Sequence, residues 1–553
     1  MTDSFKIALA QLNPTVGDVE GNAGKLLAAR EEAARQGADL VVPGELAISG
    51  YPPEDLVLKP AFQAACAAAI ARVAAATADG GSAVLITAPW SENGKLYNAA
   101  ILADAGKVQA MRFKHDLPNY GVFDEKRVFA VGPLPGPMVC RGARLGVMIC
   151  EDMWMPDSAE CLEESGAEIL IVPNGSPFEI DKPDTRMNLA VARVVETGLP
   201  LVYVNQVGGQ DELVFDGASF ALNADKSLCL QGPSFAEALL HTRWRRGNDG
   251  WACEAGIVEK PLDRVAAIYQ AMMLGLRDYV GKNRFPGVVL GLSGGIDSAL
   301  TAAVAVDALG PERVRGLRMP SPYSSRHSLD DAAETGRLLG IRVDTVGIEP
   351  AMKAFDEMMR AVFNDRPPDI TEENIQARAR GVTLMAFSNK LGHMVLTTGN
   401  KSEMSVGYAT LYGDMCGGYS VLKDVYKMTV YALARWRNAN FPAGALGPKG
   451  RAIPERSIVK PPSAELKPNQ TDRDTLPPYE KLDDILHCLV EQELSPAEIA
   501  KRGHDPATVA RVQRMLDVAE YKRRQAPPGV KITRRAFGRD RRYPITNAFR
   551  PKA

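Results

Sequence analysis

The sequence is poor in the residues that most often hold zinc or form disulfide bonds. Among 553 residues it has 8 cysteines and 6 histidines. No two cysteines have the C-x-x-C spacing, and no two histidines are spaced so that they would share one face of a helix. We therefore expect neither a zinc site nor a disulfide framework, and a reducing cytoplasm is the compartment that fits.

Long apolar runs and a strong net charge are also missing. The first ten residues contain no basic n-region of the kind that begins a signal peptide. The most apolar segment, residues 61–76, is rich in alanine and contains Arg72, so we expect it to be too short and too weakly apolar to span a bilayer. The formal net charge of −2 indicates neither a nucleic acid nor a membrane as partner.

The charge is uneven at one place, the C-terminal tail. Residues 521–553 contain eleven lysines and arginines and a single acid, Asp540. Tails of this composition more often form solvated or anion-binding surfaces than surfaces that recognise RNA. From composition alone, the tail can be either a solvated or an anion-binding surface.

The chain is too long for one ordinary hydrophobic core, so at least two domains are expected. Apolar residues make up 46% and charged residues 24%, the balance of a globular protein. In the first half, short apolar segments alternate with helical patterns, which predicts an α/β architecture. The expected strands are 5–11, 39–43, 83–88, 144–150, 169–173 and 199–205, and the expected helices include 22–36 and 186–196.

The pattern changes over residues 244–260, where we expect short polar turns. We place the domain boundary near residue 260, which gives domains 1–260 and 261–553. In the second domain, alternating helices and strands predict a doubly wound parallel sheet. The expected strands are 287–292, 314–319, 343–348 and 393–398, and the expected helices are 261–280, 298–309, 328–339 and 372–391. Residues 441–479 are rich in proline and aperiodic, which predicts a long functional loop.

One motif directly follows the apolar segment 287–292: Ser293-Gly294-Gly295-Ile296-Asp297-Ser298. Its glycines let the backbone approach an anion without a Cβ in the way. The helix that follows would present free N–H groups at its start, and these favour phosphate. The motif G-x-x-x-x-G-K-[S/T] of ordinary phosphate-binding loops is missing, so γ-phosphoryl transfer of that kind is not indicated.

A strand-to-helix turn without a ligand is the alternative interpretation, because glycine pairs are common in such turns. Asp297 favours the phosphate site. A carboxylate within an anion cradle is unfavourable unless a metal ion bridges it to the phosphates.

The motif resembles the pyrophosphate loop of the ATP pyrophosphatases, enzymes that adenylate a substrate and release pyrophosphate. Residues 396–403, L-T-T-G-N-K-S-E, resemble a second signature, that of the NAD synthetases within this superfamily. Segments 319–323, 373–378 and 412–415 are similar to the same family. The resemblance implies a Rossmann-like domain that takes ATP as a substrate together with Mg²⁺.

The resemblance also implies roles for individual residues. Asp297 and Glu403 would hold Mg²⁺ on the phosphates. Lys522 in the tail has Arg523 and Arg524 as neighbours of equal charge, and a solvated position is its alternative interpretation. The implied ATP-binding residues are Gly291, Leu292, Ser293, Gly294, Gly295, Ile296, Asp297, Ser298 and Thr398. The implied deamido-NAD-binding residues are Asn374, Glu403, Lys427 and Lys522.

In the first half, Glu45, Lys114 and Cys150 each stand at the C-terminal end of a separate apolar segment. Strand ends of this kind face one crevice in an α/β sheet, so the three side chains can converge. A carboxylate could then accept the thiol proton, an ammonium could stabilise an oxyanion, and the thiolate could attack an amide carbonyl. A cysteine that is simply a small buried residue is the alternative interpretation.

The sequence around these residues resembles the nitrilase superfamily, which uses a Glu–Lys–Cys triad. The similar segments are V-P-G-E at 42–45, K-H-D-L-P-N-Y at 114–120 and C-E-D-M-W at 150–154. Segments Y-G-V-F-D-E at 120–125 and N-G-S-P at 174–177 are similar to the glutaminase branch that is joined to NAD synthetases. The resemblance implies a nitrilase-like α-β-β-α sandwich.

The nitrilase resemblance implies that Glu45 is the general base, Lys114 the electrostatic stabiliser and Cys150 the nucleophile that forms a thioester. L-Glutamine would be bound by Tyr120, Glu125, Ser176 and Lys182, with Glu125 also supporting the triad. Arg186 is an alternative to Lys182.

Together the two resemblances imply the family of glutamine-dependent NAD synthetases. Ammonia released from glutamine would pass through a channel and attack adenylated deamido-NAD, and NAD, AMP, pyrophosphate and glutamate would be formed. A homo-oligomer, a dimer or larger, is implied as well. Three alternatives stay open: another ATP-pyrophosphatase amidotransferase, a tRNA-modifying enzyme with the same loop, and a non-catalytic partner protein.

Overall fold

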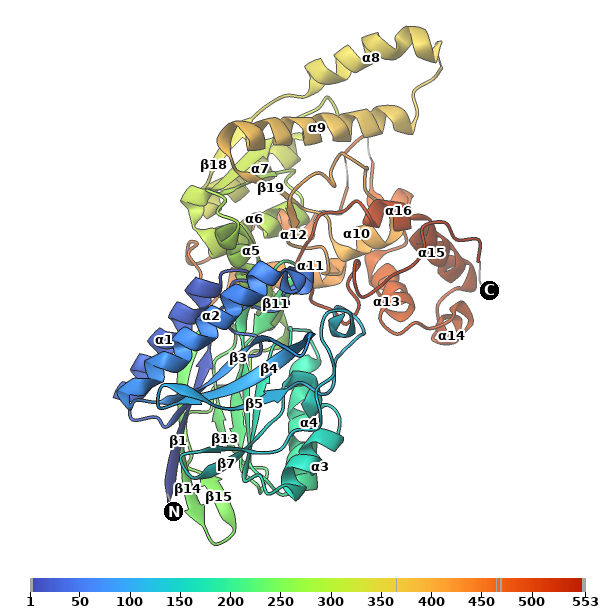
Figure 1. Ribbon diagram of the computed structural model, residues 1–553. Coiled ribbons are helices and arrows are strands. Elements are labelled where there is room, and N and C mark those ends of the chain that lie inside the picture. Colours follow the sequence, from blue (N-terminus) through green and yellow to red (C-terminus); the bar gives the residue numbers. More distant parts are fainter. Residues whose placement is uncertain (1–2, 365, 464, 468–469, 550–553) are drawn as a thin grey trace. The chain divides into compact units, whose positions relative to one another are not determined.

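The structure, a computed structural model, describes residues 3–364, 366–463, 465–467 and 470–549. It divides into two compact units, Met1–Leu262 and Asp263–Ala553 (Figure 1). Each unit has its own sheets and its own hydrophobic core, so each is described by itself.

The described part of the first unit contains two large β-sheets and one hairpin. The seven-stranded sheet has the order β15-β14-β1-β2-β3-β4-β5, and the six-stranded sheet has the order β13-β12-β9-β8-β7-β6. The first sheet consists of β1 (Ser4–Gln11), β2 (Leu40–Pro43), β3 (Ala83–Glu92), β4 (Lys95–Asp104), β5 (Lys107–Phe113), β14 (Ala238–Gly247) and β15 (Gly250–Cys253). The second consists of β6 (Met138–Cys140), β7 (Ala143–Val147), β8 (Ile169–Asn174), β9 (Leu201–Asn205), β12 (Phe220–Leu222) and β13 (Leu228–Gln231). The hairpin is β10 (Val207–Gln210) with β11 (Leu213–Asp216).

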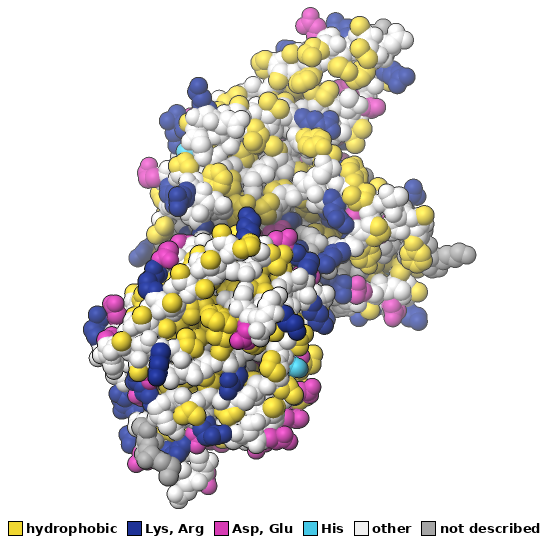
Figure 2. Space-filling view, in the orientation of Figure 1, with side chains coloured by type: hydrophobic (Ala, Val, Ile, Leu, Met, Phe, Trp, Pro, Cys, Tyr) yellow, Lys and Arg dark blue, Asp and Glu magenta, His cyan; other side chains and the backbone are white. Residues whose placement is uncertain are grey.

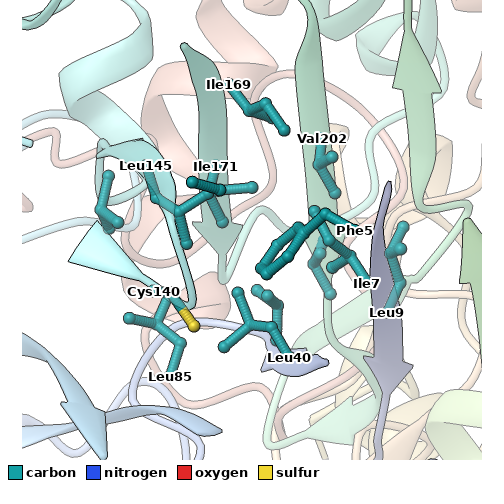
Figure 3. Packing of buried hydrophobic residues seen from close by; sticks show 14 of the residues in the cluster. Phe5, Ile7, Leu9, Leu40, Leu85, Cys140, Leu145, Ile169, Ile171 and Val202 are labelled. Atoms are coloured by element: carbon teal, nitrogen blue, oxygen red, sulfur yellow. The ribbon is translucent and has the colours of Figure 1, made fainter. Parts of the chain in front are cut away.

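The two sheets pack face to face, and helices cover their outer faces. Figure 3 shows the shared core, in which Phe5 and Leu40 of one sheet meet Ile171 of the other. Helices α1 (Val19–Arg35) and α2 (Pro60–Ala76) pack on the first sheet, and α3 (Asp157–Glu164) and α4 (Lys182–Thr197) pack on the second. This layering confirms the predicted α-β-β-α sandwich.

The end of this unit differs from the sequence prediction. Residues 244–260, expected to form polar turns, contain the end of β14 and all of β15, and β14 pairs antiparallel with β1. Along β14, Thr242 and Trp244 are buried while Arg243 and Arg245 point outward. Arginines on the outer face made this alternating strand look like a polar segment.

Helix α2 also differs from expectation. Among the described residues, Pro60–Asp79 is long and apolar enough, by length and composition alone, to cross a membrane, with a mean hydropathy of 1.4. The prediction that this segment falls short was therefore wrong on those two criteria. The helix buries Cys66, Ile70 and Val73 in the core that it shares with α1 and β3, so it packs as a core helix of this unit.

The second unit is built on a parallel sheet of the order β18-β17-β16-β19-β20. Helices alternate with these strands, which confirms the predicted doubly wound fold. The order reverses at β16, and the crevice at such a point is the usual ligand site of this architecture. The strands are β16 (Val288–Gly291), β17 (Val314–Arg318), β18 (Arg342–Thr345), β19 (Met394–Thr397) and β20 (Tyr419–Ser420).

The helices of this unit include several that the sequence did not predict. Helix α8 is one of them, and the cluster α13 to α16, which packs against α10 through a core of its own, is another. The helices are α5 (Arg264–Lys282), α6 (Ile296–Leu309), α7 (Arg326–Leu339), α8 (Glu349–Phe363), α9 (Ile370–Leu391), α10 (Lys401–Val406), α11 (Lys427–Ala439), α12 (Glu455–Val459), α13 (Tyr479–Val490), α14 (Pro496–Lys501), α15 (Pro506–Val518) and α16 (Glu520–Arg523).

The described part of the basic C-terminal tail belongs to the second unit and is partly neutralised there. Lys531 forms a buried ion pair with Asp540 at 2.8 Å. Arg523 and Arg541 both pair with the buried carboxylate of Glu520, at 2.7 and 2.9 Å. Several of the cations that suggested an anion-binding surface therefore stabilise the fold. Two others, at positions 550 and 552, lie outside the described residues.

Candidate active sites

The structure brings Glu45 and Lys114 together in the first unit, where both side chains are fully buried. Glu45 follows β2 and Lys114 follows β5. The Lys114 ammonium donates to Glu45 Oε1 at 2.7 Å. The same oxygen accepts from the Asn98 amide at 2.7 Å, and Glu45 Oε2 accepts from the Gly175 N–H at 3.0 Å. Three donors thus fix the orientation of the Glu45 carboxylate.

Glu125 completes this buried cluster. Lys114 Nζ donates to both oxygens of Glu125 at 2.9 Å, and the Tyr51 hydroxyl donates to Oε1 at 2.9 Å. Burial raises the pKa of Glu125 to about 7 against the opposing charge of Lys114. Burial by itself would lower the pKa of Lys114, but the neighbouring charges of Glu125 and Glu45 raise it well above its ordinary value. The two carboxylates therefore favour the charged form of Lys114.

Cys150 begins a 3₁₀ turn, η4 (Cys150–Met153), three residues beyond the end of β7. Its backbone has a φ of +50°, which is uncommon for a non-glycine residue, and its side chain is 3% exposed. Burial and the charge of Glu45 raise the pKa of the thiol well above its ordinary value, and Lys114 opposes this. The thiol is therefore protonated at neutral pH, and a nucleophilic attack requires a base.

Two acidic neighbours of Cys150 belong to the site although the sequence did not assign them roles. Asp152 accepts from the backbone N–H groups of Ile149 at 2.8 Å, His115 at 3.0 Å and Asp116 at 2.7 Å. It thereby joins the turn of Cys150 to the segment after Lys114. Glu151 is 6% exposed, and burial raises its pKa. The run of acids after Cys150 was the available sequence signal.

Two of the residues expected to bind glutamine, Tyr120 and Lys182, make contacts with other side chains of this site. The Tyr120 side chain is 51% exposed, and its hydroxyl donates to the Glu151 carboxylate at 3.0 Å. Lys182 Nζ lies 5.4 Å from the ring centre of Phe123 and 5.9 Å from that of Trp154.

Ser176 and Arg186 form a structural unit. The Arg186 guanidinium donates to the Ser176 hydroxyl at 3.0 Å, to the Ser176 carbonyl at 2.8 Å and to Asp216 at 2.7 Å. Arg186, the alternative to Lys182, is therefore buried and already bonded, so it holds the loop that carries Ser176.

In the second unit, the predicted phosphate loop connects β16 to α6. Gly295 is the residue before α6, and the Ser293 and Ser298 hydroxyls lie 3.1 Å apart across the loop. The Ser298 hydroxyl donates to the Gly295 carbonyl at 3.0 Å. Gly294 has a φ of +79°, and a Cβ at this position would lie 2.2 Å from the Ser328 carbonyl oxygen of α7. Only glycine fits there.

We expect Gly294→Ala to lower the melting temperature and to abolish ATP binding. A left-handed conformation costs an alanine about 1–2 kcal/mol, and the backbone overlap adds strain. Gly281→Ala in α5 is the matched control, because a Cβ there meets nothing within 4 Å. Calorimetric melting and ATP titration of both variants check this, and equal behaviour of the two would contradict the close packing of the loop on α7.

The two predicted metal ligands lie on either side of one buried lysine. Lys427 Nζ forms an ion pair with Asp297 and a second, at 3.2 Å, with Glu403. Asn400, the residue before α10, donates to Asp297 Oδ1 at 2.9 Å. Burial raises the pKa of Glu403 to about 7. Burial alone would lower the pKa of Lys427, but Asp297 and Glu403 raise it. Lys427, predicted only as a dinucleotide ligand, here joins the two carboxylates.

A cavity of about 290 Å³ lies at the carboxyl end of the sheet. It is lined by most of the predicted ATP residues, and Glu403 and Lys427 line it too. Among the described lining residues, five carboxylates stand against four cations. The acids are Asp297, Glu403, Asp414, Glu465 and Asp472, and the cations are Arg380, Lys423, Lys427 and Lys460.

Three predicted residues are not among those lining this cavity. Gly294 belongs to the phosphate loop, but it packs against α7. Asn374, on α9, accepts from the Thr410 hydroxyl at 3.0 Å. The Lys522 ammonium donates to the carbonyls of Gly407 at 2.8 Å and Ala409 at 2.6 Å, and burial lowers its pKa. Asn374 and Lys522 both hold the segment that follows α10.

The long loop predicted over residues 441–479 lines part of the cavity. Ser457 donates to the Gly294 carbonyl at 3.0 Å. Glu465 accepts from the Ser328 hydroxyl at 2.6 Å and from Lys460 Nζ at 3.3 Å. The loop is thus bonded both to the phosphate loop and to α7. Sequence periodicity alone could not assign any of these residues to a partner.

Two family models match the chain. Carbon-nitrogen hydrolase matches residues 6–244, and NAD synthase matches residues 268–526. The glutamine-dependent NAD(+) synthetase of Rhodobacter capsulatus is 51% identical over 554 residues and covers 100% of both chains. The chain belongs to the glutamine-dependent NAD(+) synthetases. The Xanthomonas campestris enzyme of the same name is 47% identical, over 99% of this chain and 98% of that one.

Solved structures of glutamine-dependent NAD(+) synthetases agree with this assignment. The enzyme from Acinetobacter baumannii, in complex with adenosine diphosphate, is 42% identical, covers 98% of each chain and has a TM-score of 0.79. The enzyme from Cytophaga hutchinsonii has a TM-score of 0.83 at 23% identity, which supports the fold alone. A glutamine-dependent NAD(+) synthetase is a ligase with glutamine as amide-nitrogen donor. The tRNA-modifying alternative therefore has no support in these relatives.

Proposed function

We propose that this chain converts deamido-NAD to NAD, with ATP as the activating substrate and L-glutamine as the nitrogen source. The observation that carries the proposal is the presence, in one chain, of a Glu45–Lys114–Cys150 cluster and of a phosphate loop with a carboxylate pair. Residues 1–260 are the glutaminase domain, and residues 261–553 are the synthetase domain with its basic tail.

In the glutaminase site, the Cys150 thiol attacks the side-chain amide of glutamine. Glu45 accepts the thiol proton, and Lys114 stabilises the negative charge that develops on the amide oxygen. Glu45 passes this proton to the amide nitrogen, ammonia leaves, and a thioester remains on Cys150. Water then attacks the thioester, which releases glutamate and restores the thiol. The raised pKa of the thiol supports these roles, because a protonated thiol needs a base to remove its proton before it can attack.

Recognition of glutamine requires partners for an ammonium and a carboxylate. The buried Glu151 carboxylate, to which Tyr120 donates, offers an acceptor for the α-ammonium group. Lys182 offers a positive charge for the α-carboxylate. Ser176 and Glu125 shape the site around them, Ser176 through its bonds to Arg186 and Glu125 through Lys114.

In the synthetase site, the loop Gly291–Gly295, Ile296–Ser298 and Thr398 bind ATP. The deamido-NAD carboxylate attacks the α-phosphorus, pyrophosphate leaves, and ammonia then displaces AMP. Carriage of neutral ammonia from one site to the other keeps it from protonation in water, and we propose a channel for it. Asn374, Glu403, Lys427 and Lys522 serve deamido-NAD. For Asn374 and Lys522 this includes holding the segment after α10.

Asp297 and Glu403 fit a magnesium ion that is shared with the nucleotide. Each carboxylate oxygen can accept more than one partner, and the carboxylates around the cavity outnumber the cations, so bound polyphosphate needs added positive charge. No cluster of three or more metal-binding acids, histidines or cysteines is found among the described residues. Mg²⁺ held by two carboxylates and phosphate oxygens would neutralise charge during adenylation.

We further propose that the enzyme is a cytoplasmic homo-oligomer, a dimer or larger. The apolar side of α8 supports an assembly surface. No described residue of α8 is buried, while Met358 is 68% and Val362 is 73% exposed. Figure 2 shows hydrophobic side chains on the surface over this helix. No nucleic acid or membrane partner is proposed.

The purified full-length chain tests the proposed function directly. We expect NAD, AMP and pyrophosphate in equal amounts, with at least as much glutamate, when ATP, Mg²⁺, glutamine and deamido-NAD are supplied together. Nicotinic acid mononucleotide and other carboxylates are the comparison substrates. Turnover of one of these in place of deamido-NAD would show that the chain amidates a different acid.

A further inference from the structure

The cavity of the second unit contains one arginine, Arg380, that has no ion-pair partner among the described residues. Its guanidinium donates to the Met319 carbonyl at 3.2 Å and to the Gln376 side chain at 3.0 Å, both neutral acceptors. Gln376 is fully buried, so this part of α9 is held firmly. Arginine has five N–H donors, and these two bonds leave several for a ligand.

The two acids of the cavity whose charges act on Arg380, Glu465 and Asp414, are already bonded to other groups. Glu465 pairs with Lys460 and accepts from two serines, and Asp414 accepts from the Thr410 N–H at 2.6 Å. Burial lowers the pKa of Arg380, and the charges of Glu465 and Asp414 only partly oppose this. A partly desolvated cation without a paired anion is unfavourable in the free enzyme. Its missing partner is therefore an anion of the ligand.

Two of the other cations that line the cavity already have carboxylate partners. Lys427 is shared between Asp297 and Glu403, and Lys460 is paired with Glu465. Arg380 lines the same cavity as Ser293 and Ser298 of the phosphate loop, which itself contains no lysine. Met319, to which Arg380 is bonded, follows β17 and lies beside the loop: a Cβ on Gly291 would approach its methyl carbon to 3.1 Å.

We propose that Arg380 binds a phosphate group of the nucleotide substrates. The planar guanidinium can donate two parallel bonds to a phosphate, which a lysine cannot do. The phosphate belongs either to ATP or to the diphosphate of deamido-NAD. The inference takes the identity of these ligands from the proposed function, but it does not require that the chain convert them.

Titration calorimetry of Arg380→Gln with adenosine, AMP, ADP and ATP tests this inference. If the phosphate belongs to ATP, affinity falls about 10- to 100-fold for ATP, the factor of one charge-assisted pair, while adenosine is unaffected. If it belongs to the dinucleotide, the same loss appears for deamido-NAD and for NAD, which share the diphosphate. Because binding is measured directly, the titrations can be interpreted even if the chain does not make NAD.

Three controls separate a phosphate contact from a structural role. Arg380→Lys keeps the charge and should lose less affinity than Arg380→Gln. Arg337→Gln, on the exposed side of α7, should change neither affinity nor melting temperature. Glutaminase activity and melting temperature report folding. An equal loss for adenosine and ATP, a loss for deamido-NAD but not for NAD, or no loss for any ligand would each overturn the proposal.

Discussion

Replacement of Cys150 by alanine should abolish glutamine-dependent NAD synthesis and leave ammonia-dependent synthesis intact. The thiol is the only atom in the proposed glutaminase site that forms a bond to the substrate, so the rate with glutamine should fall by at least about 10⁴-fold. Ammonium chloride at mildly alkaline pH supplies the nucleophile to the second unit without passing through the first. NAD formation is measured with each nitrogen source.

The matched control for this experiment is Cys161→Ala. Cys161 is a partly exposed cysteine on α3, near in sequence but outside the buried cluster. It should keep full activity with both nitrogen sources. If Cys150→Ala lost both activities while its melting temperature stayed unchanged, the assignment of the two reactions to two separate sites would be wrong.

Asp297→Asn should cripple NAD synthesis with either nitrogen source, by about 10²- to 10⁴-fold, while basal glutamine hydrolysis continues. The asparagine keeps the size of the side chain and its acceptor for Asn400 but removes the charge that Lys427 and Mg²⁺ are proposed to share. Loss of a carboxylate that neighbours a polyphosphate lowers the affinity for the metal–nucleotide complex. The concentration of Mg²⁺ at half-maximal rate should therefore rise as well.

Asp356→Asn on the exposed surface of α8 is the control for charge removal in the same unit, and it should leave the rate unchanged. An unaltered dependence of the rate on Mg²⁺ in Asp297→Asn would remove Asp297 from the metal site and leave it as a partner of Lys427 alone.

The sequence determined much of the fold because its signals are local. Buried strands such as Val288–Gly291 are continuous apolar runs, and the helices between them have a clear period, so the doubly wound sheet could be predicted. The amphipathic α8 and the arginine-rich β14 were missed. Charged side chains on an outward face obscure an alternating strand such as β14, and the apolar side of α8 was not recognised as a helical pattern.

At the sites, sequence motifs predicted which residues meet, since Glu45, Lys114 and Cys150 follow strands and Asp297 and Glu403 lie in the first turns of helices. Only the tertiary structure decided which of them are bonded to one another. The Lys427 ammonium lies between two carboxylates 106 residues apart in the chain, at 297 and 403, and Lys522 is occupied by two carbonyls. Such partners come from long-range packing, which leaves no local pattern in the sequence, whereas glycine at 294 follows from a backbone geometry that a short motif can encode.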